Sequence, residues 1–351
     1  ILFTALMIFS ITYTPSFKYG SAKAFSFFLF NWALFLSPLL LIRNERSASR
    51  MITILVLLAT VTTAYTLVTL LQSLFSGSII YSYRASFLGV NPISFANWIG
   101  AIAILLFAYL PNIGKRWHRY GAFAALGLLI LALFAANSRG PMISFILSLV
   151  LYGAIRFRKT SKRKLVQLAL VVLLFVVIAL IILPEQLTSR YTDLISQEEG
   201  SQNYAYFTIN TRLFGWKAAL EMATAHIYSV FFGVGNGGFS QVIYRQDIRW
   251  YPHNIFLEVF CELGLAGLGL LVWHLSSIWG DIRRFLRKNL TDRSRTLFYA
   301  FCMAAFFNFV NAQFSGDLND NRRLWFFLGM VVALMQVIKD RIPVKDNGSN
   351  A

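Results

Sequence analysis

The chain has 351 residues, of which 57% are hydrophobic and only 13% are charged, and its formal net charge is +17. Soluble proteins carry about twice that share of charged residues, so the composition excludes an ordinary soluble domain. The charges lie in short clusters between long apolar runs, which excludes a free-standing basic domain for nucleic acid, and we expect no nucleic-acid partner.

Long apolar segments recur along the whole chain, and a helix needs about 20 apolar residues to cross the hydrocarbon core of a bilayer. We therefore predict an all-α, polytopic membrane protein with about ten visible transmembrane helices. Because the chain is apolar from Ile1 and lacks a basic leader, we expect no signal peptide there and further spans before it. The predicted spans are 1–14, 24–42, 51–75, 94–111, 120–136, 141–155, 165–183, 254–280, 296–314 and 323–338.

The segments that connect these spans alternate between two classes of charge. Those on one side carry 21 Lys and Arg against 5 Asp and Glu, and those on the other side carry 11 against 10, which together account for the 32 and 15 of the chain. Positively charged loops stay in the cytoplasm. We therefore predict that both visible ends are cytoplasmic and that the nearly neutral side faces outward.

The longest connection, residues 184–252, lies on the outer side. Apolar residues at helical spacing, with Arg212 and Lys217 between them, predict an amphipathic helix at the membrane surface over residues 211–226, and the glycines that follow predict a flexible turn. The chain thus divides into an N-terminal transmembrane bundle (1–183), a large outer loop with amphipathic helices (184–252), C-terminal transmembrane helices (253–339) and a cytoplasmic tail (340–351).

His253 lies where the long outer loop meets the next predicted span. A lone His at a helix start more often caps or packs, but two arginines, Arg245 and Arg249, come shortly before this one. A neutral imidazole at that place can take a proton from a hydroxyl. His253 is therefore a candidate general base.

Arginine outnumbers lysine on the outer side. Taken singly, an outer arginine is also explained as an anchor that reaches the lipid head groups. Taken together, guanidinium groups bind phosphate bidentately and keep their charge in a low dielectric, so the set fits a lipid-linked diphosphate sugar at the membrane surface. The set consists of Arg84, Arg139, Arg190, Arg212, Arg245, Arg249, Arg322 and Arg323.

His253 and Asn254 are followed, after nine residues, by Gly264 and Gly267. This H-N-x9-G-x-x-G stretch resembles the pattern of the bacterial O-antigen ligases. The flanking sequence resembles that of the wider O-antigen ligase and polymerase superfamily.

Three arginines resemble family features in the same order along the chain. Arg139 follows a span as the family's outer arginine does, although Ile143 stands where the family pattern has Leu. Arg212, with Trp216 after it, resembles the second family arginine near the end of the large periplasmic loop. Arg84 resembles a family feature that precedes a span.

The resemblance implies a GT-C-like, metal-independent, inverting glycosyltransferase in the bacterial inner membrane, with its active site facing the periplasm and no cofactor. Its donor would be an undecaprenyl diphosphate-linked glycan and, for a ligase, its acceptor would be lipid A-core. The resemblance implies His253 as general base or orienter, Arg139 and Arg212 as diphosphate ligands, and Asn254 and Glu258 as further substrate contacts.

Two alternatives stay open. A polymerase of the same superfamily would use a growing polysaccharide as acceptor. A flippase for lipid-linked glycans, or another transporter, would also handle such a lipid, but transporters more often place ionisable groups within their spans, and the spans 51–75, 120–136, 141–155 and 165–183 contain almost none. Membrane lipids are expected partners in every case. Cys261 and Cys302 lack the spacing of a disulfide framework or a zinc site.

Overall fold

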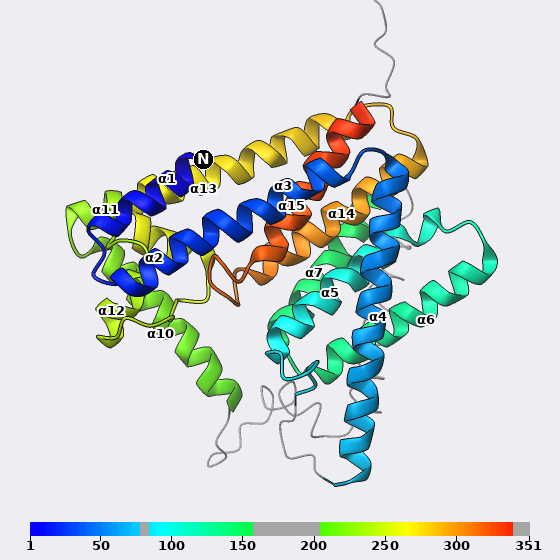
Figure 1. The fold of residues 1–351 in the computed structure, drawn as a ribbon, viewed down its shortest axis with the longest axis horizontal. Helices are drawn as coiled ribbons and strands as arrows, with labels where there is room; N and C mark the ends of the chain where they lie inside the picture. The colour runs from blue at the N-terminus through cyan, green and yellow to red at the C-terminus, as the bar shows by residue number, and fades with distance from the viewer. Residues whose placement is uncertain (78–83, 157–203, 340–351) are drawn as a thin grey trace, which may run out of the picture.

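The computed structural model describes residues 1–77, 84–156 and 204–339, with the backbone alone for 204–207, and every regular element in these ranges is a helix (Figure 1). The elements are α1 (Leu2–Phe9), η1 (Ser10–Thr12), α2 (Phe17–Ser26), η2 (Phe27–Asn31), α3 (Trp32–Leu41), α4 (Glu45–Phe75), α5 (Pro92–Tyr109), η3 (Leu110–Asn112), α6 (Arg116–Ala135), α7 (Arg139–Arg156), α10 (Tyr204–Thr224), α11 (Ile227–Phe232), α12 (Gly238–Tyr244), α13 (Ile255–Leu286), α14 (Asp292–Asn311) and α15 (Arg322–Lys339).

Five helices of the described part are long and apolar enough to cross a membrane, and each overlaps a predicted span. The predicted segments 141–155, 296–314 and 323–338 are also helical, as α7, α14 and α15, and the segment 1–14 holds α1 and η1. The predicted span 165–183 and the tail 340–351 lie outside the described residues, so the number of spans stays a prediction. The five helices are Phe17–Leu41, Glu45–Phe75, Pro92–Asn112, Arg116–Ala135 and Ile255–Leu286.

Residues with short polar side chains cap the N-terminal ends of several helices. The Asn44 side chain accepts the backbone N–H of Ser47 at 2.8 Å, and the Ser47 hydroxyl accepts the N–H of Asn44 at 3.2 Å, which forms a capping box at the start of α4. Asn91 caps α5, with Pro92 in the first helical position, and Thr291 caps α14. Each cap satisfies a backbone N–H group that the first turn of its helix leaves unpaired.

The helix α5 lies at the centre of the bundle, packed against α6, α7 and α14. It is buried on every side from Ile99 to Leu106, as expected of a helix that is apolar all round. Gly100 faces Phe307 of α14, and a Cβ at Gly100 would come within 2.6 Å of that ring. The glycine therefore allows the two central helices to approach closely.

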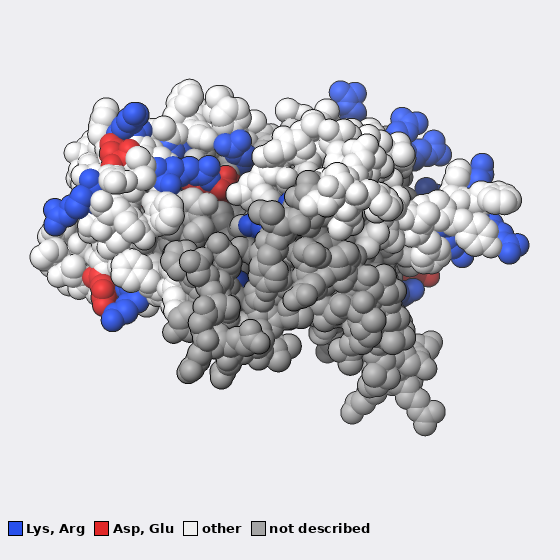
Figure 2. All heavy atoms as spheres, turned by 90° about the horizontal axis from the view of Figure 1, so that it is seen from below, with Lys and Arg blue, Asp and Glu red and all other residues white. Residues whose placement is uncertain are grey.

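The polar connections gather at opposite sides of the bundle. On one side, the Ser294 hydroxyl donates to Glu45 and the Asn112 amide donates to the carbonyl of Arg293, both at 2.9 Å, so three basic connections lie together. On the other side lie the segments around η1, α10 to α12 and the start of α13 (Figure 1). Figure 2 shows mostly uncharged surface between a left end with Lys, Arg, Asp and Glu together and a right end with Lys and Arg prevailing.

Candidate functional site around His253

A break divides α13 after its first turns. Gly264 has φ 63° and ψ −163°, outside the helical range. The carbonyls of Cys261 and Glu262, which a continuous helix would pair internally, instead accept the N–H groups of Val234 and Gly235 at 3.0 and 2.9 Å. The loop between α11 and α12 therefore fills the break and satisfies the hydrogen bonds that it frees.

Glycines let these two backbone segments touch. Gly233 lies against the backbone of Glu262, and Gly264 lies against the backbone of Phe231, so that a Cβ on either glycine would overlap main-chain atoms. The same loop also packs closely against Gly20 of α2. The turn that the sequence predicted to be flexible is thus packed on two sides, by α13 and by α2.

His253 and Asn254 form the entry to α13, and each suits its place. His253 has a positive φ of 61°, a conformation that His and Asn adopt more readily than most residues. Asn254 is the N-cap, and its side-chain oxygen accepts the N–H groups of Phe256 and Leu257 at 3.0 and 3.1 Å. The positive φ of His253 therefore changes the direction of the chain just before α13, and Asn254 starts the helix.

The imidazole of His253 is neutral and largely buried. Burial, followed by the positive charge of Arg212, lowers its pKa to about 4, and Asp317 opposes the shift. The Tyr251 ring packs edge-on against it with the ring centroids 4.6 Å apart. Its Nδ1 is buried and has no hydrogen-bond partner among the described residues.

Arg212 reaches this site from α10, the helix predicted as amphipathic. Gly215, one turn further along α10, packs against the chain just before His253, where a Cβ would lie 3.5 Å from the Cα of Pro252. Ala219, on the next turn, packs with Cys261 of α13 in a small apolar core. These contacts dock α10 on the first part of α13 and bring Arg212 to the imidazole.

Arg139 opens α7 on the neighbouring side of the site. Gly140 packs against the turn formed by residues 311–314 at the end of α14, where a Cβ on Gly140 would lie 3.6 Å from Oδ1 of Asn311. The amide of Asn254 donates to a carbonyl of the same turn at 3.4 Å. The starts of α7 and α13, which carry Arg139 and the His–Asn pair, therefore meet on one turn of α14.

Arg84 belongs to the same side of the molecule. The N–H of Ala85 donates to the carbonyl of Ala135 at 3.0 Å, where α6 ends and the chain turns toward Arg139. Ala85 and Ala135 are fully buried. The structure thus places the segments bearing Arg84 and Arg139 together.

Arg249 lies next to Tyr251 and is already paired. Its guanidinium bonds Asp317 with an Nε to Oδ2 distance of 3.2 Å, contacts Asp320, and lies over the Tyr251 ring. Burial alone would lower its pKa, but the two carboxylates raise it above its ordinary value. Arg249 therefore supports the tyrosine that packs on His253.

The other predicted arginines lie elsewhere. Arg322 donates to the Asn319 carbonyl at 3.2 Å and to the Ser26 hydroxyl at 3.3 Å, and Arg323 interacts with Asp320. Arg245 is exposed at the end of α12, and Arg190 lies outside the described residues. In the described part of the chain, His253 interacts with Tyr251, Arg212 and Asp317, and not with Arg245, Arg322 or Arg323.

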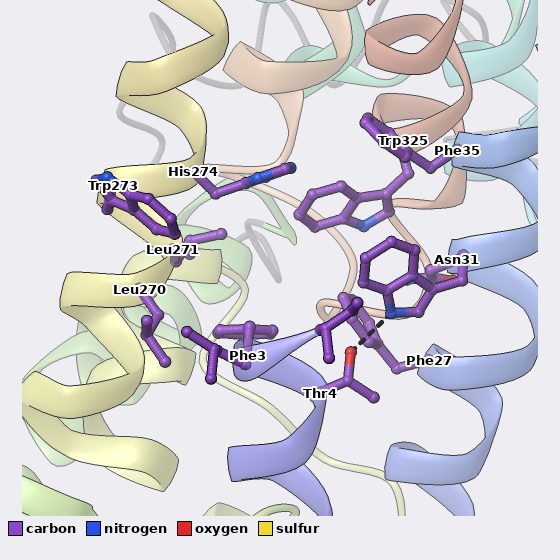
Figure 3. A pocket seen from close by; sticks show the side chains of 13 residues that line it. Phe3, Thr4, Phe27, Asn31, Phe35, Leu270, Leu271, Trp273, His274 and Trp325 are labelled. Carbon is purple, nitrogen blue, oxygen red and sulfur yellow. Dashed lines mark hydrogen bonds between the residues drawn. The ribbon is translucent and has the colours of Figure 1, made fainter. Parts of the chain in front are cut away.

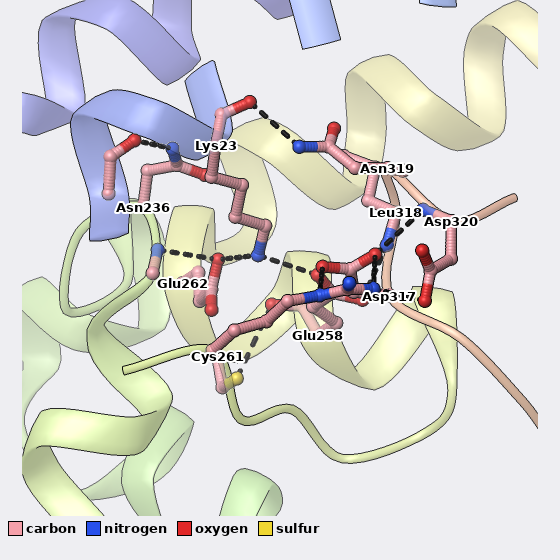
Figure 4. A network of polar contacts seen from close by, with 12 residues as sticks. Lys23, Asn236, Glu258, Cys261, Glu262, Asp317, Leu318, Asn319 and Asp320 are labelled. Atoms are coloured by element: carbon pink, nitrogen blue, oxygen red, sulfur yellow. Dashed lines mark hydrogen bonds and ion pairs between the residues drawn. The ribbon is translucent and has the colours of Figure 1, made fainter. Parts of the chain in front are cut away.

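A buried lysine beneath the site holds two carboxylates (Figure 4). Lys23 of α2 is 2% exposed, and its Nζ lies 2.5 Å from Oε1 of Glu258 and 2.5 Å from Oε2 of Glu262. Glu262 also accepts the N–H of Gly237 at 2.8 Å. Lys23 therefore joins α2, α13 and the loop between α11 and α12 (residues 233–237, called the glycine loop below) at one point.

Glu258, predicted to contact the substrate, is 1% exposed and fully engaged in this network. Its second oxygen accepts the N–H of Leu318 at 2.9 Å. The adjacent Asp317 accepts the Tyr19 hydroxyl at 2.8 Å and the N–H of Asp320 at 2.7 Å. Burial favours the neutral form of Asp317, yet the nearby cations and these donors hold its pKa below the ordinary value.

Lys23 and Asp317 were missed as functional candidates because the sequence places them in short connections. One signal was present. Glu258 and Glu262 stand four residues apart in an apolar helix, which puts both carboxylates on one face, and buried carboxylates require a cation. Such a pair predicts a buried lysine or arginine on a neighbouring helix, but it does not say which one.

The arrangement brings together the segments that carry a neutral base and two arginines, with a polar support, at one side of a helical bundle. Such a set can orient a hydroxyl, remove its proton and stabilise a departing phosphate. Residues 124–272 match the family model described as O-antigen ligase, and this range contains Arg139, Arg212 and His253. No curated protein matches the chain.

Proposed function

We propose, from the O-antigen ligase domain that the chain carries at residues 124–272, that it transfers a glycan from undecaprenyl diphosphate to an acceptor hydroxyl at the periplasmic face of the bacterial inner membrane. The observation that carries the proposal is the meeting of three segments. The start of α7 with Arg139, the start of α13 with His253 and the α10 helix with Arg212 pack around one site.

The chemistry follows from these groups. The acceptor oxygen attacks the anomeric carbon as the bond from that carbon to the diphosphate oxygen breaks, and the imidazole of His253 takes the hydroxyl proton. Arg139 and Arg212 receive the charge that grows on the departing diphosphate. Attack from the face opposite the leaving group inverts the anomeric configuration. In this scheme the guanidinium groups supply the charge stabilisation, so we expect transfer to persist in EDTA.

Donor binding prepares the base. Burial and, after it, the charge of Arg212 lower the pKa of His253 to about 4, so the imidazole is a weak base before a donor binds. A diphosphate bound to Arg212 cancels that charge and adds negative charge nearby, which raises the pKa toward the pH of the periplasm. Proton transfer is therefore favoured only once the donor is bound.

The acceptor is tested by incubating the purified protein with the lipid-linked glycan alone and, separately, together with lipid A-core. We propose a ligase, which would attach glycan to lipid A-core and leave the lipid-linked glycan unextended. Longer lipid-linked glycan in the first reaction would identify a polymerase instead. Movement of the donor across proteoliposomes without any new glycosidic bond would identify a flippase and overturn the transferase proposal.

A further inference from the structure

The helices α13 and α14 touch at their ends and separate between them. At the outer end, the rings of Phe256 and Phe309 lie 6.0 Å apart, and at the other end those of Phe285 and Phe298 lie 4.7 Å apart. Between these pairs is a cavity of about 480 Å³, which α7 and α15 complete. We refer to this cavity as the α13–α14 groove.

The α13–α14 groove is apolar and open to the side. Its lining includes Leu151 and Ile155 of α7, Leu275 of α13 and Phe306 of α14, and no described residue that lines it is charged. Trp279, on its edge, is 49% exposed. A long hydrocarbon chain can therefore enter from the bilayer without crossing water.

The groove is built from the same helices as the candidate site. The helix α7 begins with Arg139 and lines the groove in its second half, α13 follows directly on His253 and Asn254, and α14 ends in the turn that both helix starts contact. Phe256, at the outer end of the groove, stands three residues from His253. Further along α13, the residues that line the groove lie between Val272 and Leu286, a stretch of helix about 21 Å long.

We infer that the α13–α14 groove binds the polyisoprenoid chain of the lipid-linked donor. This inference rests on the proposed function. The groove has Phe256 at the end nearest His253, and the helices that line it also carry Arg139 and follow His253. This arrangement matches an amphiphile with an anionic diphosphate head and a single long chain. A phospholipid differs, because its single phosphate carries two chains.

A second cavity, of about 380 Å³, lies on another side of α13 and is less suited to this role (Figure 3). It is lined by Phe27, Trp32, His274 and Trp325, among others. Its lining includes no residue of α7 or α14, so it does not share the two helices that lead to Arg139 and the 311–314 turn.

The groove contributes only modestly to the affinity for the donor. A chain that moves from lipid into the groove exchanges one apolar surrounding for another, so the hydrophobic effect contributes little. Filling the groove should therefore raise the KM for a long-chain donor by roughly tenfold, which corresponds to about 1.4 kcal/mol. A donor whose isoprenoid is too short to reach the groove should be unaffected.

Ser276→Trp tests this, because Ser276 is an exposed lining residue. Ser277→Trp is the matched control, since Ser277 is the next residue, is exposed and does not line the groove. We expect Ser276→Trp to raise the KM for a 55-carbon donor roughly tenfold at unchanged kcat, and to leave a 10-carbon donor unchanged. Equal KM values for the two variants with the long donor would overturn the inference.

A second measurement does not depend on transfer. Polyprenyl diphosphate with a diazirine near the end of its chain is photolysed with the purified protein, and the labelled peptides are identified. We expect label on α13 and α14, lost in Ser276→Trp, kept in Ser277→Trp, and displaced by polyprenyl diphosphate but not by phosphatidylglycerol vesicles. Label on other helices, or displacement by phosphatidylglycerol, would contradict the groove assignment.

Together, the two measurements distinguish a failure of the proposed function from a failure of the groove assignment. Label in the groove without any transfer would refute the proposed function and keep the groove as a polyprenyl site. Transfer with label elsewhere would keep the function and refute the groove.

Discussion

At the scale of single residues, the pairing of Lys23 with Glu258 and Glu262 shows how a helical bundle accommodates a buried cation. Both carboxylates also accept backbone N–H groups, from Leu318 and Gly237. Breaking a buried ion pair by removing one partner costs more than replacing the whole pair, because it leaves an unpaired charge. The network should therefore respond very differently to partial and to complete neutralisation.

Lys23→Met should destabilise the protein by about 3–5 kcal/mol, since two buried carboxylates lose their cation. Adding Glu258→Gln and Glu262→Gln should recover a large part of that loss. Lys18→Met is the control, because Lys18 is exposed. Thermal unfolding in detergent measures the effect. A single Lys23→Met variant as stable as the control would show that the network does not hold α2 on α13.

His253 should give the transfer reaction an unusual pH dependence. Its pKa of about 4 lies below the ordinary 6.5, so the active neutral form persists as the pH falls. We expect kcat/KM, which reports the free protein, to stay level from pH 8 to about 5.5 and to fall only near pH 4. The acid limb of the kcat profile should lie at a higher pH than that of kcat/KM, because the bound diphosphate raises the pKa of His253.

The matched control for this profile is His226→Gln, which removes an exposed histidine and should leave the acid limbs of both kcat and kcat/KM in place.

The lowered pKa of His253 also affects the stability of the fold. Because the unfolded chain binds the proton at a higher pH than the folded chain does, the contribution of His253 to stability is present above about pH 6.5 and is lost as the pH falls toward 4. A kcat/KM that falls already near pH 6.5 would contradict the buried, neutral imidazole.

At the scale of elements, the break in α13 explains why a His–Asn pair stands at a fixed distance before two glycines. Asn254 starts the helix, Gly264 ends its first section, and the glycine loop enters the gap. The short section between them carries Glu258 and Glu262 toward Lys23. The spacing therefore sets the position of His253 relative to α2 and α10.

Gly264→Ala should damage this arrangement. A side chain at positive φ costs about 1–3 kcal/mol, and the added Cβ would overlap the backbone of Phe231, so we expect a marked fall in both melting temperature and transfer. Gly269→Ala is the control, because a Cβ there meets nothing within 4 Å. Equal melting temperatures for the two variants would show that the break does not need glycine.

At the scale of the whole molecule, hydropathy predicted the approximate positions of the five described helices that are long and apolar enough to cross a membrane, because apolar runs of that length leave little choice. The structure begins one membrane-crossing helix at Phe17 instead of residue 24, because the charge of Lys23 interrupts the apolar pattern while buried carboxylates neutralise it. A partner more than 200 residues away in sequence cannot be read from local spacing.

The candidate site could be predicted in part. His253, Arg139 and Arg212 stood out by residue type and by resemblance, and the structure places their segments together. The contact of Arg249 with Asp317 and the burial of Glu258 depend on how α13, α14 and the 312–321 segment fold over one another, which periodicity does not specify. The sequence likewise contained the glycines of the loop but not the helix break that they fill.

Orientation in the membrane is a property of the whole chain and can be tested directly. In a Cys302→Ser background, a membrane-impermeant thiol reagent applied to intact spheroplasts should label Lys217→Cys on α10 and not Arg287→Cys after α13. Both positions are exposed. The expectation follows from the excess of basic residues on the side of Arg287, and the reverse labelling would invert the predicted topology.

We propose that the site around His253 transfers a glycan from a lipid diphosphate and releases that diphosphate. The most direct measurement is the amount of undecaprenyl diphosphate released per glycan attached to the acceptor, with His253→Asn beside the natural chain. Asn tolerates the positive φ and retains the local fold while removing the base. We expect one diphosphate released per glycan transferred and a loss of about 100-fold or more in kcat for His253→Asn. Full activity in His253→Asn, or transfer without release of the diphosphate, would contradict it.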